Sequence, residues 1–339
     1  MSLIDKKLNF LRPIKTPHLA RFGEKSDGGY VVDSEIMKNT NTLISFGLGP
    51  NWKFELDYLS KNVNNKVHIY DHTITIYPYI KRIIKYIRRF ITFKTNIEGL
   101  LAPIKAFSNF KKFLNNKRVK YFKENISYPI LKPIDTDIDK VFSRINSNEN
   151  VIIKCDIEGS EYDIIDQILK YSEKIDMLIF EFHWIFSPDK SSYVGSYKND
   201  KFHGNGSYSF GDGTKYTGEF KNGLPNGKGT YIYPDGSEYE SEFKDGKGLG
   251  EKGIYIPTFK EEIFYQSVKK LQRNFEIIHL HGNNHNPINE VGFPHVAEMT
   301  MVNKKLMPEL KEFVHNLPLK DLDYPNQPFK DDVILSFDK

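Results

Sequence analysis

The sequence predicts an α/β protein with a doubly wound, Rossmann-like, mostly parallel sheet that is interrupted by a small all-β array of hairpins. Three observations support this prediction. Strand patterns alternate with helical patterns along most of the chain. Between residues 193 and 256, a stretch rich in glycine and aromatic residues repeats every 23 residues. This stretch separates a strand pattern from the helix pattern that follows it, so it interrupts a strand–helix–strand unit of the sheet.

The strands and helices can be placed from their hydrophobic periodicity. Buried-strand patterns occur at 42–47, 66–71, 119–123, 151–156, 177–183, 275–281 and 296–302. Helical spacing of apolar residues occurs at 52–61, 136–146, 160–171 and 258–274. In doubly wound sheets, ligands bind beyond the carboxyl ends of the strands. We therefore expect the functional side chains directly after these strands.

Composition restricts the class of protein. The 339 residues are 39% hydrophobic and 27% charged, and the net charge of +4 is too mild to indicate a nucleic-acid partner. No apolar run reaches the roughly eighteen residues of a transmembrane helix, and the charged N-terminal stretch does not resemble a signal peptide. The one cysteine, Cys155, excludes an intramolecular disulfide and a multi-cysteine metal cluster. These features favour a cytoplasmic protein.

The repeat begins at Tyr193, Tyr216 and Tyr239. Asp-Gly pairs between aromatic-rich runs are a strong hairpin signal, so each unit reads as one β-hairpin. The pattern resembles the MORN repeat, and the first two units match it well. The third unit departs from the pattern, because Ser241 and Lys252 replace recurring glycines.

The array is predicted to be an insertion after the fifth strand. Residues 190–256 form it, with two good units and a degenerate one, and residues 1–186 and 259–339 form a discontinuous host domain. Isolated hairpins are marginally stable, so the array is expected to lean on its flanks. Loops after strands lie on the ligand side of such sheets, which predicts that the array projects beside the mouth of the ligand-binding site.

A Gly-x-Gly turn follows the first strand. Gly47 and Gly49 let the backbone approach a ligand closely at the start of a helix, and Asp71 at the end of the second strand can accept hydrogen bonds from ribose hydroxyls. Together they suggest a nucleoside site, and the alternative is a tight turn without a ligand. A dinucleotide is disfavoured, because the third glycine of the full motif is absent and residue 52 is a tryptophan.

The end of the fourth strand carries an acidic cluster, Asp156, Glu158 and Glu161, with Gly159 at the turn. Acids at the start of a helix can be simple caps, and this alternative stays open on spacing alone. Residues 154–161, however, closely resemble the [KR]-x-D-[IV]-E-G-x-E signature of the FkbM-type methyltransferases. The segment 21–32, with its Asp-Gly-Gly-Tyr run, and the loop after the first strand resemble further segments of this family in the same order. The resemblance spans about residues 20–186 and 259–303.

The resemblance implies the class I S-adenosylmethionine-dependent methyltransferase fold and O-methylation of a sugar, glycan or glycosylated metabolite. Gly47 and Gly49 would face the methionine end of the cofactor, and Asp71 the ribose. The full set of expected cofactor-binding residues is Asp27, Gly28, Gly47, Gly49, Asp71 and Asp156. The expected catalytic residues are Asp156, Glu158 and His183. Ser45 stands where the family commonly has an acid.

Methyl transfer to a hydroxyl requires a group that takes the hydroxyl proton. His183, at the exit of the fifth strand, is a candidate, and its alternative role is packing. His279, His281 and His285 suggest a metal site, but side chains packed in the sheet or in a loop explain them as well. No metal is predicted, although Asp156 and Glu158 could hold Mg²⁺.

Residues 79–94 form an amphipathic helix with a strongly basic face. A solvated face on a packed helix is the default explanation, and contact with anionic lipid or an anionic acceptor is the alternative. The membrane contact could also involve the MORN array, at the inner face of the membrane. Self-association is a further expectation. The alternative function is an inactive methyltransferase fold that serves as a scaffold or membrane-docking module, and nucleotide-dependent redox chemistry is disfavoured by the missing third glycine.

Overall fold

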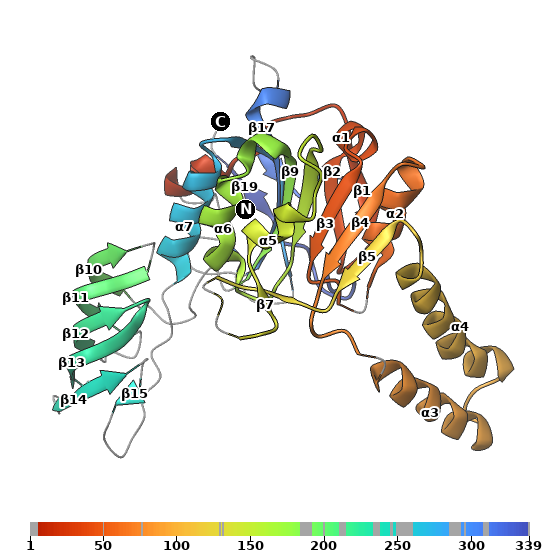
Figure 1. Ribbon diagram of the computed structural model, residues 1–339, viewed down its shortest axis with the longest axis horizontal. Helices are drawn as coiled ribbons and strands as arrows, with labels where there is room; N and C mark the ends of the chain where they lie inside the picture. The colour runs from red at the N-terminus through yellow and green to blue at the C-terminus, as the bar shows by residue number, and fades with distance from the viewer. Residues whose placement is uncertain are drawn as a thin grey trace.

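A seven-stranded sheet forms the centre of the structure, a computed structural model (Figure 1). In spatial order its strands are β5 (Val119–Phe122), β4 (Lys66–Tyr70), β3 (Thr42–Phe46), β8 (Val151–Cys155), β9 (Ile175–Phe182), β17 (Ala297–Asn303) and β16 (Phe275–Gly282). The first five strands are parallel, and β17 runs antiparallel to both of its neighbours. All seven predicted strands are confirmed to within two residues at their ends. In chain order along this sheet, β9 is the fifth strand.

The structure describes residues 6–49, 51–75, 77–128, 130, 132–183, 192–198, 201–209, 215–232, 238–244, 247–248, 260–284, 293–294, 296–307 and 312–337. The side chains of residues 6–7, 78, 192, 239, 247–248, 260–263 and 266 lie outside that description.

Each face of the sheet carries its own hydrophobic core. One core packs η1 (Lys6–Leu11), α5 (Ile138–Ser143), α6 (Glu161–Leu169), α7 (Lys260–Leu271) and the C-terminal segment against the sheet. The other packs the hairpin β1 (Leu19–Gly23) and β2 (Gly29–Asp33), α1 (Ser34–Asn39), α2 (Lys53–Lys61) and the end of α4 (Ile97–Leu114). Residues alternate between the faces along each strand, so Leu43 and Ile44 belong to different cores. The predicted helix 136–146 is shorter than expected at both ends: it begins at Ile138, where Asp137 caps its N-terminus, and it ends at Ser143.

Short elements complete the domain. They are the bridge of β6 (Asn125–Ile126) with β7 (Asp135–Thr136), the 3₁₀ turns η2 (Ser172–Lys174) and η3 (Lys304–Leu306), and the pair β18 (Asn316–Leu317) with β19 (Leu335–Ser336). Sequence periodicity did not predict these elements or the β1–β2 hairpin, because pairs of two to five residues are too short to show a period.

The repeat region folds as one antiparallel sheet of three consecutive hairpins. Its strands are β10 (Ser192–Lys198), β11 (Lys201–Ser209), β12 (Lys215–Lys221), β13 (Leu224–Ile232), β14 (Glu238–Lys244) and β15 (Lys247–Gly248). The pairing repeats at the predicted interval, because Gly204 faces Phe220 as Gly227 faces Phe243. The ring of Tyr216 lies across its own hairpin, where a Cβ added at Gly229 would come within 2.1 Å of the hydroxyl. The recurring glycines therefore make room for the recurring tyrosines.

The array lies beside α6 and α7 at the lower left of Figure 1. Lys201 Nζ of the array donates a 2.6 Å hydrogen bond to Asp163 Oδ1 on α6. None of the described residues of the array lines the cavity at the carboxyl ends of the parallel strands, so a role at the mouth of the acceptor site stays a prediction.

Two helices, α3 (Tyr77–Ile91) and α4, form a hairpin that projects at the lower right of Figure 1. The sequence predicted α3 to within three residues but not α4. No helix in the described part of the chain is long and apolar enough to cross a bilayer.

Candidate functional site

A cavity of about 700 Å³ lies at the carboxyl ends of the parallel strands, within the range of about 300–1,000 Å³ that is usual for small-molecule sites. It is lined by every residue that the sequence predicted for catalysis or cofactor binding: Asp27, Gly28, Gly47, Gly49, Asp71, Asp156, Glu158 and His183. These residues come from five separate segments of the chain. The fold therefore assembles them in one place, as the edge of a doubly wound sheet should.

The glycine loop after β3 approaches the end of β8 closely. Gly47 and Gly49 have φ angles of +73° and +60°, which other residues rarely adopt. A Cβ at Gly47 would lie 1.7 Å from the carbonyl oxygen of Asp156, whereas a Cβ at Gly49 would meet nothing within 4 Å. Glycine at 47 is thus required by both space and backbone geometry, and at 49 by backbone geometry alone.

Asp71 holds this loop in place. Its Oδ2 accepts hydrogen bonds from the backbone N–H groups of Leu48 (2.9 Å) and Gly49 (3.0 Å), and its Oδ1 accepts from the N–H and hydroxyl of Thr73 (2.7 and 2.6 Å). Burial raises the pKa of Asp71, but these hydrogen bonds outweigh it and hold the pKa below its usual value. A ribose hydroxyl would have to share the carboxylate with the loop.

Asp27 and Gly28 lie in the turn of the β1–β2 hairpin and also line the cavity. The carbonyl oxygen of Asp27 accepts a 3.3 Å hydrogen bond from Asn51 Nδ2. A Cβ at Gly28 would lie 2.5 Å from that same nitrogen. Asn51 therefore connects the β1–β2 hairpin to the turn that leads into α2.

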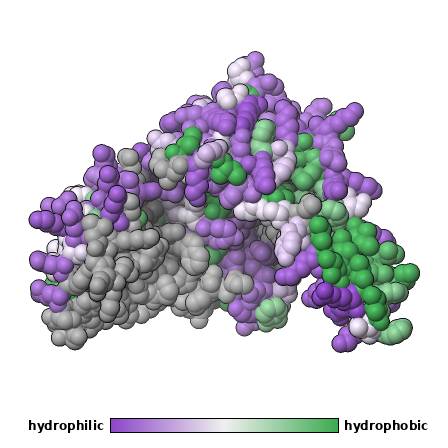
Figure 2. Space-filling view, turned by 60° about the horizontal axis from the view of Figure 1, so that its bottom comes forward, coloured by the Kyte–Doolittle hydropathy of each residue, from purple (hydrophilic) through white to green (hydrophobic). Residues whose placement is uncertain are grey.

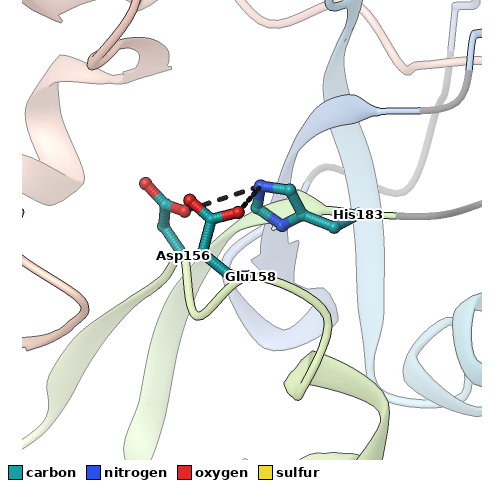
Figure 3. A group of neighbouring side chains, drawn as sticks. All are labelled: Asp156, Glu158 and His183. Carbon is teal, nitrogen blue, oxygen red and sulfur yellow. Dashed lines mark ion pairs between the residues drawn. The ribbon is translucent and has the colours of Figure 1, made fainter. Parts of the chain in front are cut away.

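Asp156, Glu158 and His183 converge at the ends of β8 and β9 (Figure 3). His183 Nε2 lies 3.9 Å from Asp156 Oδ1 and 3.6 Å from Glu158 Oε2. Glu158 has a φ of +55°, unusual for a residue with a side chain, and its side chain is 81% exposed. Strained backbone of this kind is concentrated at functional sites.

A buried carboxylate orients the histidine. Glu161 Oε1 lies 2.9 Å from His183 Nδ1 and also accepts the N–H groups of Ile157 and Gly159. Burial lowers the pKa of His183, but Glu161, Glu181 and Asp156 outweigh it and raise the pKa to about 9. Glu161 is therefore more than a helix cap, because it links the acidic turn to the histidine and leaves Nε2 directed at the two carboxylates.

A second set of site residues was not predicted. The buried hydroxyl of Tyr30 lies within hydrogen-bond distance of both Asp156 Oδ2 (3.2 Å) and Glu181 Oε2 (3.1 Å), and Asn283 Nδ2 donates to Glu181 Oε1 (3.1 Å). Burial and then Asp156 raise the pKa of Glu181 to about 8. The sequence could have indicated Glu181 by its position. It precedes His183 by two residues, so the two side chains leave the same side of the strand.

Lys154 and Glu55 lie beneath the glycine loop. Lys154 Nζ donates to the carbonyl oxygen of Gly47 (3.1 Å) and lies 3.9 Å from Glu55 Oε1, which accepts from Ser45 Oγ at 2.7 Å. Burial lowers the pKa of Lys154, but Glu55, Asp156 and Glu181 outweigh it and raise the pKa, so the lysine stays charged. Burial raises the pKa of Glu55. Glu55 thus brings an acid to Ser45, the position where the resembled family commonly has one.

The site offers a donor set that suits a cation. One ligand atom each from Asp156, Glu158 and His183 lie within 4.8 Å of one another. Carboxylate oxygens suit Mg²⁺ and Mn²⁺, and imidazole nitrogen suits Zn²⁺ and Fe²⁺. Metal binding at all three atoms would require the neutral form of His183, against its raised pKa. The same three atoms can also form hydrogen bonds with a hydroxyl group of a ligand.

The other histidines that suggested a metal are ion-paired with the C-terminal segment. His279 Nε2 lies 2.9 Å from Asp323 Oδ1, and His281 Nε2 lies 2.9 Å from Asp332 Oδ1. His285 lies outside the described residues. His279 and His281 therefore join β16 to the end of the chain, which gives them a structural role.

Stability should depend on pH through His281. Burial lowers its pKa, but hydrogen bonds to Asp332 and Glu298 and the charge of Asp323 outweigh it and raise the pKa to about 10. A raised folded-state pKa gives stability that is complete below the unfolded value of about 6.5 and is lost as the pH rises through about 10. We expect the free energy of unfolding, measured by denaturant titration, to fall by a few kcal/mol over this interval. In His281→Gln the fall should be smaller, and an unchanged pH slope would contradict this assignment.

Comparison with protein families matches the MORN repeat at residues 193–215 and 216–238. Residues 193–238 are two MORN repeats. The third, degenerate unit is not matched, although β14 and β15 extend the MORN sheet by a further hairpin.

Comparison with solved structures found distant likenesses. An S-adenosylmethionine-dependent methyltransferase from Clostridium acetobutylicum is 13% identical with a TM-score of 0.29, and the match covers 77% of this chain and 83% of that chain. Coclaurine N-methyltransferase bound to N-methylheliamine and SAH is 11% identical with a TM-score of 0.24, covering 54% and 52%. WbdD with a kinase inhibitor is 8% identical with a TM-score of 0.24, covering 80% and 58%. These TM-scores are too low for any structural or functional assignment. Comparison with curated protein sequences found no match.

Proposed function

We propose that this protein is an S-adenosylmethionine-dependent O-methyltransferase that acts on a hydroxyl of a sugar, glycan or glycosylated metabolite. The observation that carries the proposal is the convergence on one cavity of all eight predicted residues, seven from the FkbM-type resemblance and His183 from its place at the exit of the fifth strand. The sheet supports it, because the first five strands follow the doubly wound order 3-2-1-4-5 and the reversed β17 lies between β9 and β16, as in class I methyltransferases.

The residues present fit the cofactor. Gly47 and Gly49 bring bare backbone to the cavity, and the space beyond Gly49 is open for 4 Å. The helix α2 begins directly after this loop and has no side-chain cap at Trp52, so its N-terminal dipole favours a carboxylate such as that of the methionine end. Asp71 would accept from the ribose.

The reaction assigns the remaining roles. When bound, S-adenosylmethionine supplies an electrophilic methyl group. Asp156 is placed to take the proton of the acceptor hydroxyl, with Glu158 at the exposed side of the cavity as a further hydrogen-bond acceptor. His183, whose pKa is raised to about 9, carries its proton at neutral pH and lies beside Asp156 as its charge partner. Tyr30 and Glu161 orient Asp156 and His183 from behind. An acceptor rich in hydroxyl groups suits a wall that also presents Asn125.

Calorimetry with S-adenosylhomocysteine tests the proposal. The parent protein should bind it, and Asp71→Asn should weaken binding at least tenfold, because an amide cannot accept all four hydrogen bonds that Asp71 takes from the loop and from Thr73. Asp321→Asn is a matched control, since Asp321 is exposed and has a φ of +65°, which asparagine tolerates. Absence of binding to the folded parent protein would refute the enzyme and leave an inactive docking module.

A further inference from the structure

The helical hairpin α3–α4 leaves much of its apolar surface in solvent. Tyr79 on α3 stacks on Phe110 of α4, with 5.1 Å between ring centroids, and α4 is joined to the host domain where Trp52 contacts Phe110 and Phe113. The predicted packed helix is therefore packed on one side only. The other side of α3 faces solvent.

The exposed apolar residues form a stripe on each helix. On α3, Ile80, Ile84, Ile87 and Ile91 follow helical spacing and are 41–68% exposed. On α4, Ile97, Leu101 and Ile104 do the same and are 40–61% exposed. Monomeric proteins rarely leave contiguous apolar surface of this extent without a partner.

The tip of the hairpin adds a further apolar group. Phe93, between the two helices, is 97% exposed and has a φ of +53°, an unfavourable backbone conformation for an aromatic residue. The chain therefore presents this ring to solvent at a position that packing does not explain.

The positive charge of the protein is concentrated on the same hairpin. Residues 77–114 contain nine lysines and arginines and one glutamate, a net charge of +8, whereas the whole chain carries +4. On α3 the basic residues border the isoleucine stripe: Lys81, Arg82, Lys85, Arg88 and Arg89. Figure 2 shows the hydrophobic side chains of this hairpin at the right, directly beside strongly hydrophilic ones.

We infer that the hairpin α3–α4 docks on an anionic lipid surface, with Phe93 and the isoleucine stripe among the acyl chains and the basic residues at the headgroups. An apolar face bordered by lysine and arginine is the pattern of interfacial helices. A second copy of the chain fits less well, because two hairpins of the same large positive charge would repel each other.

The docking would bring the cavity to the lipid surface. Asp71 and Thr73 line the cavity, and α3 begins only four residues after Thr73. The hairpin therefore leaves the host domain from the edge where the candidate site opens, and an acceptor attached to a lipid headgroup would be within reach.

Vesicle cosedimentation of the full chain tests this inference. The protein should bind phosphatidylcholine vesicles that contain phosphatidylserine, bind pure phosphatidylcholine much more weakly, and dissociate as salt is raised. Lys85→Glu/Arg88→Glu should weaken binding by about fivefold or more for each basic residue removed. Lys38→Glu/Lys320→Glu is the matched control, because it changes the net charge equally at exposed lysines outside the hairpin.

The apolar contribution has its own pair of variants. Phe93→Ser should weaken vesicle binding about tenfold, since the ring would otherwise be buried in lipid. Phe329→Ser removes an 84% exposed ring outside the hairpin and should bind as the parent does. Both substitutions are at exposed positions, so thermal unfolding should confirm folded protein in each case.

Three outcomes would overturn the inference. The first is failure of the parent to bind anionic vesicles, and the second is an equal loss of binding in the hairpin and control variants. The third, undiminished binding by the hairpin variants, would assign any docking to the MORN array. A parent that is dimeric in gel filtration, with Phe93→Ser monomeric and vesicle binding unchanged, would assign the stripe to a second copy. None of these results depends on cofactor binding, so failure here is distinguishable from failure of the proposed enzyme.

Discussion

Gly47→Ala should abolish binding of S-adenosylhomocysteine and destabilise the protein by several kcal/mol. The added Cβ would lie 1.7 Å from the carbonyl oxygen of Asp156, which is backbone and cannot rotate away. The φ of +73° adds roughly 1–2 kcal/mol of strain for a residue with a side chain. Relief of the clash would separate the glycine loop from the turn that carries Asp156 and so would open the cavity. Calorimetry and denaturant titration measure the two effects.

Gly49→Ala is the matched control for this substitution. Its φ of +60° imposes a similar strain of roughly 1–2 kcal/mol, but its Cβ would meet nothing within 4 Å. The protein should remain folded and lose only about that much stability. Its effect on ligand binding then reports whether the open space beyond Gly49 is occupied. If Gly47→Ala were as stable as Gly49→Ala, the close approach of the loop to β8 would be wrong.

Lys154→Ala should destabilise the protein by about 3–5 kcal/mol, because it removes the cation that pairs with the buried carboxylate of Glu55. Lys154 is 5% exposed at its side chain, Glu55 is fully buried, and Asp156 and Glu181 also contribute to the raised pKa of the lysine. The carbonyl oxygen of Gly47 would lose its donor as well. Urea unfolding at neutral pH measures the loss.

An exposed ion pair provides the comparison. Lys170→Ala breaks the pair with Asp139, in which both side chains are about half exposed, and should change stability by about 1 kcal/mol or less. The double variant Lys154→Met/Glu55→Gln should recover part of the loss, since it removes both charges of the buried pair. Equal losses in Lys154→Ala and Lys170→Ala would show that the buried lysine does not balance the acids.

The location of the candidate site was predictable because it depends on strand ends. Asp71, Asp156 and His183 each follow a strand whose buried pattern is plain in the sequence, and parallel strands bring their carboxyl ends to one edge. The Gly-x-Gly loop was predictable for the same reason, because it directly follows the first strand. The contacts that each residue makes at this edge were harder to predict from the sequence. Asp71 was expected to face a ribose, and in the structure it first holds the loop.

The buried polar groups behind the site could not be predicted in the same way. Alternation shows that Ser45, Lys154 and Glu181 leave their strands toward one face of the sheet, but it does not show what lies opposite. Glu55 comes from α2 and Tyr30 from a hairpin that no periodicity indicated. Contacts between elements far apart in the chain depend on how the layers pack, and a single sequence carries no measure of that.

By itself the sequence determined the seven strands of the sheet, the MORN repeats between β9 and α7, and the eight predicted residues of the cavity lining, because local periodicity, glycine spacing, strand ends and the family resemblance indicate these features. Only the tertiary structure decided which charged groups neutralise one another and which apolar faces are covered. The pattern of residues 79–94 is the same for a packed helix and for one that meets a membrane. The difference arises from the host domain, which contacts the hairpin mainly at Trp52 and leaves the isoleucine stripe and Phe93 in solvent.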